Sequence, residues 1–278
     1  MPRLPQKLSL LIEKLATEIP TILGRNLVGI YPYGSVTNSS FNPERSDVDC
    51  IVVTRRDVSE PQFRKLKQLF EQTEKSNSWA TRLQIIFLIK GQLLKMNARA
   101  CHYQFGVFRR GRSDGNPIIW LDYLRSRKIV FGPSVDTFLP EITPRTFLRA
   151  LRRELHYLRE EISLKPKSEW RDVPMYRAFA VLTICRVLYS FDKGTIVSKP
   201  AAAEWAMRTL PERWSGIINR ALDFNENGRE SEIPLRRIEQ FLTFAESKLI
   251  GSNAWSECDS PGTGNTAFYR PFLDTNVF

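Results

Sequence analysis

One stretch, Gly29–Thr54, constrains the fold of this chain more than any other part of its sequence. Two apolar runs, 28–33 and 48–53, are joined by a polar loop rich in turn-forming residues, which predicts two neighbouring strands. The second run begins at two carboxylates, Asp47 and Asp49. Because alternate side chains of a strand point to the same face, these carboxylates are expected side by side at one end of a sheet.

This arrangement of charges predicts a metal and phosphate site. Two like charges held close repel each other, and a divalent cation between them relieves the repulsion. Carboxylates are ligands that Mg²⁺ prefers, so Asp47 and Asp49 are candidate metal ligands and catalytic residues. A Gly-Ser pair at a strand end lets backbone N–H groups approach a phosphate. Gly34 and Ser35 are therefore candidate nucleotide-binding residues, and Ser46, directly before Asp47, is a further candidate.

The order of these features is more informative than any one of them. Alone, Asp-x-Asp is usually a solvated turn or a cap, and Gly-Ser is usually a simple turn. Here an apolar run, Gly-Ser, eleven intervening residues, Asp-Val-Asp and a second apolar run follow one another. This combination resembles the signature of the polymerase-beta-type nucleotidyltransferase superfamily, which implies a nucleoside triphosphate, Mg²⁺ and pyrophosphate as the leaving group.

The first half of the chain alternates between strand and helix patterns. Helices are predicted at 5–25, 60–76 and 118–127, and strands at 27–33, 48–54, 82–89 and 129–131. The third strand is nearly all apolar, so we expect it to be buried on both faces. The basic segment 109–116 is predicted to be a loop. These elements predict a small mixed sheet with helices packed on it.

From Pro144 onward the pattern changes to helices alone. Further helices are predicted along an apolar stripe from Phe147 to Ile162 and at 175–191, 201–210 (capped by Ser198), 212–224 and 233–250. The predicted fold class is α+β, with an N-terminal nucleotidyltransferase-type mixed sheet followed by an all-helical domain. The predicted divisions are a first domain, 1–140, a helical domain, 141–251, and a flexible tail, 252–278.

The net charge of +11 is unusual, and the pI is near 9.7. Such a balance predicts an anionic partner: nucleotide phosphates, nucleic acid or a membrane surface. The N-terminal segment has the pattern of an amphipathic helix, and the most apolar run, 83–89, is too short to cross a bilayer. We therefore expect a cytoplasmic protein without membrane contact. The four scattered cysteines lack zinc-site spacing and are expected to be reduced thiols.

The third predicted strand, TRLQIIFLI, carries the residue with the largest consequence for the chemistry. A site with paired metal-binding aspartates normally needs a third carboxylate on a neighbouring strand, to complete the metal shell or to take a proton from the attacking hydroxyl. The one polar candidate there is Gln84, whose amide cannot act as a base and is a weak metal ligand. Gln84 is thus a candidate catalytic-site residue, with Glu71 or Glu74 as alternative sources of the carboxylate.

Two further segments extend the resemblance. The helical half contains FAVLTICRVLYSFDKGTIVSKPAAAEWAMRTLP, and the middle of the chain contains WLDYLRSRKIVFGP. Both are similar to segments of the aminoglycoside 3''-nucleotidyltransferases, the streptomycin/spectinomycin adenylyltransferase family, and the matches span about residues 25–250. The resemblance implies Mg²⁺-dependent transfer of AMP from ATP to a hydroxyl of a small cationic aminoglycoside or aminocyclitol.

The resemblance also implies roles for individual residues. Arg186 and Lys199 match family positions that face the ATP phosphates. Trp170 and Asp172 lie where the family places residues that bind the cationic acceptor. The family has a Glu that serves as base at the position of Gln84. Replacing such a base by an amide typically removes a contribution of ~10²–10⁴-fold in rate.

Three functions stay open on the sequence alone. The first is an ATP-dependent nucleotidyltransferase acting on a small hydroxyl compound. The second is a nucleotide-binding pseudoenzyme or regulator on the same fold, suggested by Gln84. The third is a nucleotidyltransferase acting on RNA or protein, suggested by the basic charge, so nucleic acid is a less favoured partner. The protein is expected to be a monomer.

Overall fold

The computed structural model describes residues 4–227 and 232–250. The chain divides into two compact units after Glu141. The first unit is built on one sheet with helices, and the second is helical. The predicted α+β class is therefore confirmed. The predicted tail, 252–278, lies outside the described residues.

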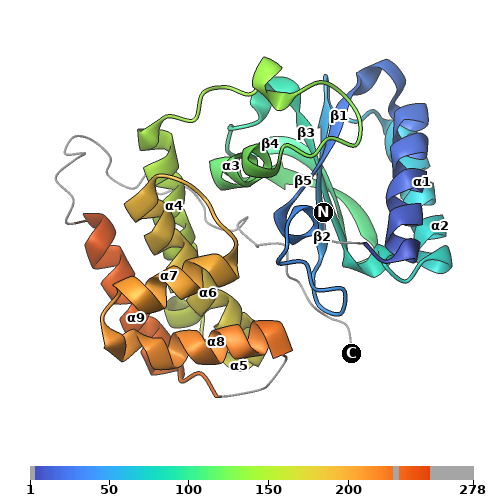
Figure 1. The fold of residues 1–278 in the computed structure, drawn as a ribbon. Helices are drawn as coiled ribbons and strands as arrows, with labels where there is room; N and C mark the ends of the chain where they lie inside the picture. Colours follow the sequence, from blue (N-terminus) through green and yellow to red (C-terminus); the bar gives the residue numbers. More distant parts are fainter. Residues whose placement is uncertain (1–3, 228–231, 251–278) are drawn as a thin grey trace. The chain divides into compact units, whose positions relative to one another are not determined.

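The N-terminal unit is organised around a five-stranded sheet in the order β1-β2-β3-β4-β5 (Figure 1). Its strands are β1 (Leu27–Tyr33), β2 (Val48–Thr54), β3 (Leu83–Ile89), β4 (Ala98–Gln104) and β5 (Val107–Ser113). β2 and β3 run parallel, and the other neighbouring pairs are antiparallel. β1 and β2 have their predicted bounds, and β3 is buried on both faces up to its last residue.

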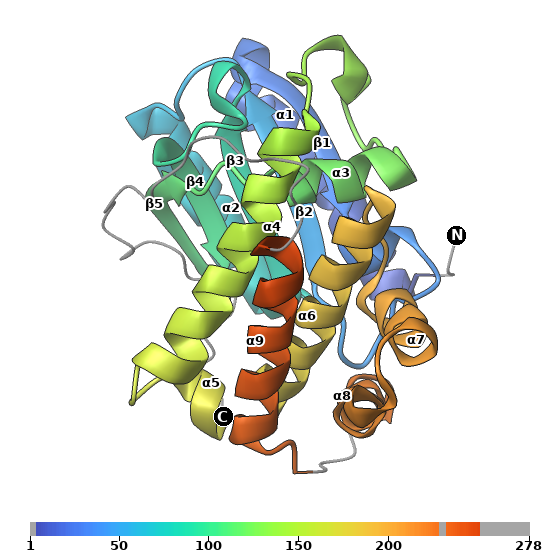
Figure 2. The ribbon, with the colours of Figure 1, turned by 90° about the vertical axis from the view of Figure 1, so that its left-hand side faces the viewer.

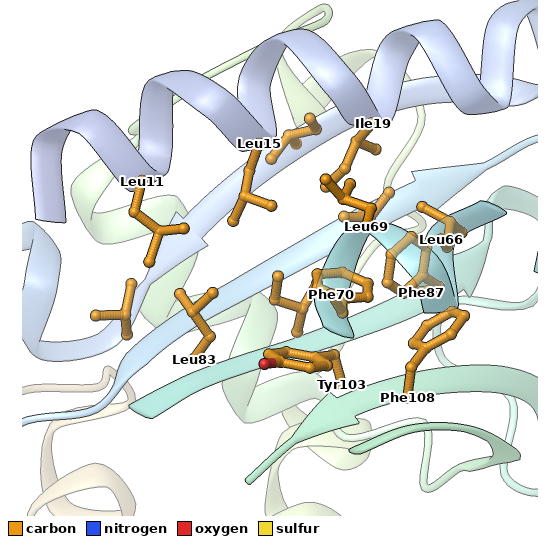
Figure 3. Packing of buried hydrophobic residues seen from close by; sticks show 14 of the residues in the cluster. Leu11, Leu15, Ile19, Leu66, Leu69, Phe70, Leu83, Phe87, Tyr103 and Phe108 are labelled. Atoms are coloured by element: carbon orange, nitrogen blue, oxygen red, sulfur yellow. The ribbon is translucent and has the colours of Figure 1, made fainter. Parts of the chain in front are cut away.

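Helices cover both faces of this sheet. They are α1 (Gln6–Leu23), α2 (Glu60–Ser76) and α3 (Pro117–Ser126). α1 and α2 lie on one face, while α3 lies on the other face beside β1 (Figure 1). Apolar residues at helical spacing on α1 and α2 pack against alternate residues of the strands, among them Leu83, Phe87 and Tyr103 (Figure 3). This packing leaves the remaining strand residues to form the opposite face.

β4 and β5 form a hairpin that the sequence pattern did not predict. The segment 109–116, expected to be a loop, continues β5 as far as Ser113. The turn consists of Phe105 and Gly106, whose φ angles of 49° and 75° are those a tight two-residue hairpin requires. β5 is an edge strand with exposed arginines, and Phe108 is its one buried large apolar residue. Such a strand lacks the regular apolar alternation on which prediction relies.

The helical unit is centred on α6, which contacts α4, α5, α7, α8 and α9. Its helices are α4 (Pro144–Arg159), α5 (Glu169–Asp172), α6 (Pro174–Lys193), α7 (Lys199–Thr209), α8 (Ser215–Asn227) and α9 (Leu235–Ile250), with a π-helical turn at Glu160–Leu164. Within this unit, α4, α6 and α9 run side by side (Figure 2). Ser198 caps α7 as predicted, because its side chain accepts a hydrogen bond from the N–H of Ala201.

Cys50, Cys101 and Cys185 are unpaired thiols, as expected. The predicted strand 129–131 is reduced to a single bridge between Phe131 and Ile30. Among the described residues, no helix combines the length and the apolar character needed to cross a bilayer.

Candidate active site

The polar residues at the strand ends form one row across the sheet. Tyr33 of β1 is paired with Asp49 of β2. Asp49 is paired in turn with Gln84 of β3, and Gln84 with Gln104 of β4. Directly paired residues project from the same face of a sheet. This face is opposite to α1 and α2, because the alternate residues of β3 and β4 pack on those helices (Figure 3).

Gly34 closes β1 and lies against the Asp49 carboxylate. Its φ is +71°, and a Cβ added there would lie 2.5 Å from Asp49 Oδ2, so only glycine fits without strain. The Gly34 N–H donates to Asp122 Oδ2 of α3 at 2.9 Å, and Asp122 also accepts from Arg125 at 3.0 Å. This N–H is therefore already engaged. The contacts of Gly34 with a nucleotide stay a prediction.

Asp47 and Gln84 are in direct contact. The Gln84 Nε2 donates a hydrogen bond to Asp47 Oδ2 at 2.9 Å, and Gln84 is only 4% exposed. Because a carboxylate can only accept, the amide must turn its nitrogen toward Asp47. The structure thus brings Asp47, Asp49 and Gln84 together, and Gln84 presents a donor to its neighbour rather than a base.

Arg82 fixes the loop that leads into Asp47, and no sequence pattern identified it. Its guanidinium donates to the carbonyl of Pro43 at 2.6 Å and to the carbonyl of Ser46. It also lies 4.3 Å from the centroid of the Trp79 ring. Burial lowers the pKa of Arg82, and the negative charge of Asp47 acts in the opposite direction. The sequence shows only that a basic residue stands just before the third strand. It does not show that this residue binds backbone carbonyls, because every residue has one.

Ser35 and Ser46, the two predicted nucleotide-binding serines, lie in turns. Ser35 belongs to a 3-10 turn, Gly34–Thr37, and its carbonyl accepts from the N–H of Asn38 at 3.0 Å. The Ser46 hydroxyl accepts from the N–H of Asn42 at 2.9 Å. Both serines are half-buried. Their contacts with a nucleotide stay predictions.

The surroundings of Tyr33 are acidic. Burial raises the pKa of Tyr33 well above its usual value, and the carboxylates of Asp49, Asp122 and Asp114 raise it further. A field of this sign favours a cation. The described residues contain no group of three or more His, Cys, Asp or Glu side chains that could hold a metal. Mg²⁺ is commonly bound by one or two carboxylates together with substrate phosphates. Asp47 and Asp49 fit that mode of binding.

Glu71 and Glu74 do not supply the missing carboxylate. Both belong to α2, which packs on the face of the sheet opposite Gln84. Glu71 lies 3.8 Å from Lys67, and the Glu74 carboxylate fills the space that a Cβ on Gly106 would need. The alternative drawn from the sequence is therefore wrong. Helical periodicity gives the apolar stripe of α2 but not the face of the sheet that the helix covers.

Two predicted phosphate contacts belong to the helical unit. Arg186 is half-buried on α6, and Lys199 is the first residue of α7. The Lys199 Nζ lies 3.2 Å from the centroid of the Phe179 ring, a cation–π contact. The roles of Arg186 and Lys199 in nucleotide binding stay predictions.

The two predicted acceptor-binding residues have different surroundings. Trp170 is 5% exposed and stacks on Tyr176, with ring centroids 5.2 Å apart. The Tyr157 ring meets Trp170 edge-on at 5.6 Å. Asp172 is exposed at the end of α5. Trp170 is thus a core residue of the helical unit, and the binding of an acceptor by Trp170 or Asp172 stays a prediction.

Two families match consecutive parts of the chain. Residues 12–101 match the family described as "Nucleotidyltransferase domain". Residues 137–248 match the family described as "Aminoglycoside adenylyltransferase, C-terminal domain". The first match contains the Gly34 turn, both aspartates and Gln84, and the second covers most of the helical unit.

Individual relatives agree with these matches. The chain is similar to a spectinomycin 9-adenylyltransferase of Campylobacter jejuni, with 26% identity over 215 residues, 72% of this chain and 79% of that protein. It is also similar to an aminoglycoside (3'') (9) adenylyltransferase of Klebsiella pneumoniae, with 22% identity over 265 residues, 86% of this chain and 96% of that protein.

A solved structure shares the fold. It is the spectinomycin adenyltransferase AAD(9) from Enterococcus faecialis with ATP and spectinomycin. The TM-score is 0.68 at 18% sequence identity, and the match covers 87% of this chain and 99% of that one. At this identity the likeness shows the fold, and it confirms the predicted nucleotidyltransferase architecture.

Proposed function

Since this chain belongs to the aminoglycoside 3''-nucleotidyltransferase family, within the polymerase-beta-type superfamily, we propose that it transfers AMP from ATP to a hydroxyl of a small aminoglycoside-like or aminocyclitol-like acceptor. The observation that carries the proposal is the Asp47–Asp49 pair, with the Asp49 carboxylate lying against the Gly34 turn. The adenylyltransferases to which the chain is similar suggest the acceptor class.

The proposed reaction exchanges one phosphorus–oxygen bond for another. The acceptor oxygen bonds to the α-phosphorus of ATP while the bond to the bridging oxygen of pyrophosphate breaks. Asp47 and Asp49 would hold Mg²⁺, which when bound neutralises charge on the triphosphate and on the departing pyrophosphate. The turn that begins at Gly34 would orient the phosphates through the backbone of Ser35. Arg186 and Lys199 are further proposed phosphate ligands.

The proton of the attacking hydroxyl needs a destination, and β3 offers no carboxylate. The Gln84 amide cannot take a proton near neutral pH, and its N–H is engaged with Asp47. We therefore infer that the acceptor hydroxyl loses this proton to solvent in an equilibrium before the attack, so that the alkoxide is the nucleophile. The chemical step should then accelerate as pH rises. A Glu base of ordinary pKa would instead be ionised above about pH 5 and give a flat profile.

Titration of Mg-ATP by calorimetry, followed by a pyrophosphate-release assay with spectinomycin and streptomycin, tests the proposal. We expect Mg-dependent binding and acceptor-dependent release, both strongly reduced in Asp47→Asn. Asp136→Asn is the matched control, because Asp136 is exposed and bonded to Ser134 outside the site. Equal pyrophosphate release from wild type and Asp47→Asn would sink the proposed role of the aspartates.

A second candidate function is nucleotide binding without efficient turnover, on the same fold. The hydrogen bond from Gln84 to Asp47 favours it, because the residue at the expected base position instead stabilises a metal ligand. Mg-ATP binding that depends on Asp47, with no pyrophosphate release for any acceptor tested, would select this function over transfer.

A further inference from the structure

Gln104, at the end of β4, carries a buried donor that the fold does not use. The residue is 7% exposed, and its Nε2 has no hydrogen-bond partner within the part of the chain that the structure describes. A buried N–H without a partner destabilises a folded protein. Such groups are rare in native folds and call for a specific explanation, such as a catalytic role or a bound ligand.

The position of Gln104 connects it to the candidate active site. Gln104 is paired with Gln84, which is paired with Asp49. The three side chains therefore project from one face of the sheet, one after another on neighbouring strands. Neighbouring strands lie about 4.8 Å apart, which puts Gln104 roughly 10 Å from Asp49. A small acceptor whose hydroxyl attacks a nucleotide held at the aspartates can extend that far along the row.

The β4–β5 part of this face suits an uncharged oxygen rather than a cation. Neither strand contains an Asp or Glu. On the same face as Gln104, His102 is paired with the exposed Arg109. Burial lowers the pKa of His102 to about 4, so its ring is neutral at pH 7. Carboxylates lie near these strands, among them Asp47, which accepts from Gln84, and Glu74 of α2, which lies beside Gly106 at the turn. Since β4 and β5 themselves offer an ammonium group no carboxylate, Gln104 is better suited to a hydroxyl, ether or carbonyl oxygen, which can accept from its amide N–H.

We propose that Gln104 is an acceptor-binding residue whose Nε2 donates a hydrogen bond to a hydroxyl, ether or carbonyl oxygen of the acceptor substrate. The assignment rests on the proposed nucleotidyl transfer and narrows its acceptor. The oxygen-bearing side of the acceptor lies over β3 and β4, and its cationic groups lie away from these strands.

Two substitutions separate an oxygen partner from an ammonium partner. Gln104→Met keeps the volume and removes the donor, and we expect the KM for spectinomycin to rise about 10-fold with kcat and the Kd for Mg-ATP unchanged. Gln104→Glu replaces the donor with a negative charge, so an oxygen partner predicts a larger rise in KM than Met gives. A Glu variant with a lower KM than the Met variant would show an ammonium partner and overturn the proposal.

A thermal measurement tests the same assignment without an acceptor. If the Gln104 Nε2 is unsatisfied in the free protein, Gln104→Met should raise Tm. A fall in Tm would instead show that the amide has a structural partner, and the proposal would fail. Tyr103→Phe is the matched control, because the Tyr103 hydroxyl is also buried and without a partner among the described residues. Unlike Gln104, Tyr103 lies on the helix-covered face, where its ring stacks on Phe70 with centroids 4.1 Å apart. The Tyr103→Phe variant should have a higher Tm than the wild type and an unchanged KM for spectinomycin.

The outcomes distinguish this inference from the function on which it rests. Turnover by the wild type with an unchanged KM in Gln104→Met overturns the role of Gln104 alone. Failure of the wild type to bind or turn over spectinomycin and streptomycin in the presence of Mg-ATP overturns both the acceptor class and this assignment.

Discussion

The two halves of one row across the sheet differ in charge. The β1–β2 half presents Asp47 and Asp49 beside the Gly34 turn, and the β3–β4 half presents two amides, Gln84 and Gln104. The halves share a face and are one strand spacing apart, about 4.8 Å. Carboxylates can hold a metal and, through it, phosphates. Amides can orient an oxygen but cannot take a proton near neutral pH.

We propose that this difference separates nucleotide binding from the handling of the acceptor. Changes in the acidic half should abolish both Mg-ATP binding and turnover. Changes in the amide half should alter the rate, its pH dependence and the affinity for the acceptor, while Mg-ATP binding is preserved. Substitutions that exchange the chemical character of the two halves therefore test the separation directly.

Asp49→Asn should have the largest effect. An amide cannot replace a charged metal ligand, so we expect turnover to fall by about 10³-fold, the scale of a lost electrostatic contribution at an active site. Single-turnover pyrophosphate release with spectinomycin measures this change. Asp192→Asn, an exposed aspartate beside Lys193, is the control and should have wild-type activity. A loss of less than about 10-fold would place the metal elsewhere.

Gln84→Glu should give the amide half a carboxylate that can take the proton of the acceptor hydroxyl. We expect the single-turnover rate at pH 7 to rise about 10²-fold. The steep increase of the wild-type rate with pH should become flat above the pKa of the new carboxyl, which the neighbouring Asp47 raises above its usual value. Gln84→Met, which lacks both the hydrogen bond to Asp47 and a base, should give no increase. Identical pH profiles for wild type and Gln84→Glu would mean that Gln84 does not occupy the base position.

Gly34→Ala should weaken the acidic half without removing a charge. The added Cβ would lie 2.5 Å from Asp49 Oδ2 on a backbone with φ of +71°. Strain of this kind costs about 1–3 kcal/mol, so the Kd for Mg-ATP should rise about 10-fold by calorimetry. Gly91→Ala is the control, because nothing lies within 4 Å of its added Cβ. Equal affinities in the two variants would disprove the close approach of Asp49 to the turn.

Arg82→Met should have the smallest effect on nucleotide binding. It leaves the carbonyls of Pro43 and Ser46 without their donor, so we expect a loss of about 1–2 kcal/mol in the free energy of unfolding. The loop before Asp47 would be less ordered, and the Kd for Mg-ATP should rise by a few-fold. Denaturant unfolding and calorimetry measure both changes. Arg64→Met is the control and should leave both quantities close to the wild-type values, because Arg64 is exposed and pairs with Glu60 on its own helix.

Part of the fold was predictable because local signals agree with tertiary structure. β1, β2 and α2 have their predicted bounds, since apolar runs with turn or cap residues at their ends define them. The β4–β5 hairpin was not predictable in this way. Its edge strand is rich in arginine, and its turn places Phe105, a residue other than glycine, at positive φ.

The site shows the same limit at the level of residues. Asp47 and Asp49 were identifiable because residue type and spacing suggest their chemistry, and Gln84 because it is the one polar candidate on the strand where a third carboxylate is expected. Arg82 donates to backbone carbonyls, and Gln104 is placed beside Gln84 by strand register. Neither kind of relationship is encoded in a short motif, so both residues required the structure.

Transfer of labelled AMP to the acceptor is the reaction that we propose for this protein, and it can be followed directly. The protein would be incubated with Mg²⁺, spectinomycin and ATP labelled at the α-phosphate, and the label would be followed into spectinomycin. We expect labelled spectinomycin with the wild type and none with a variant carrying both Asp47→Asn and Asp49→Asn. Mg-ATP binding with no labelled acceptor, or equal labelling by that double variant, would contradict the proposal.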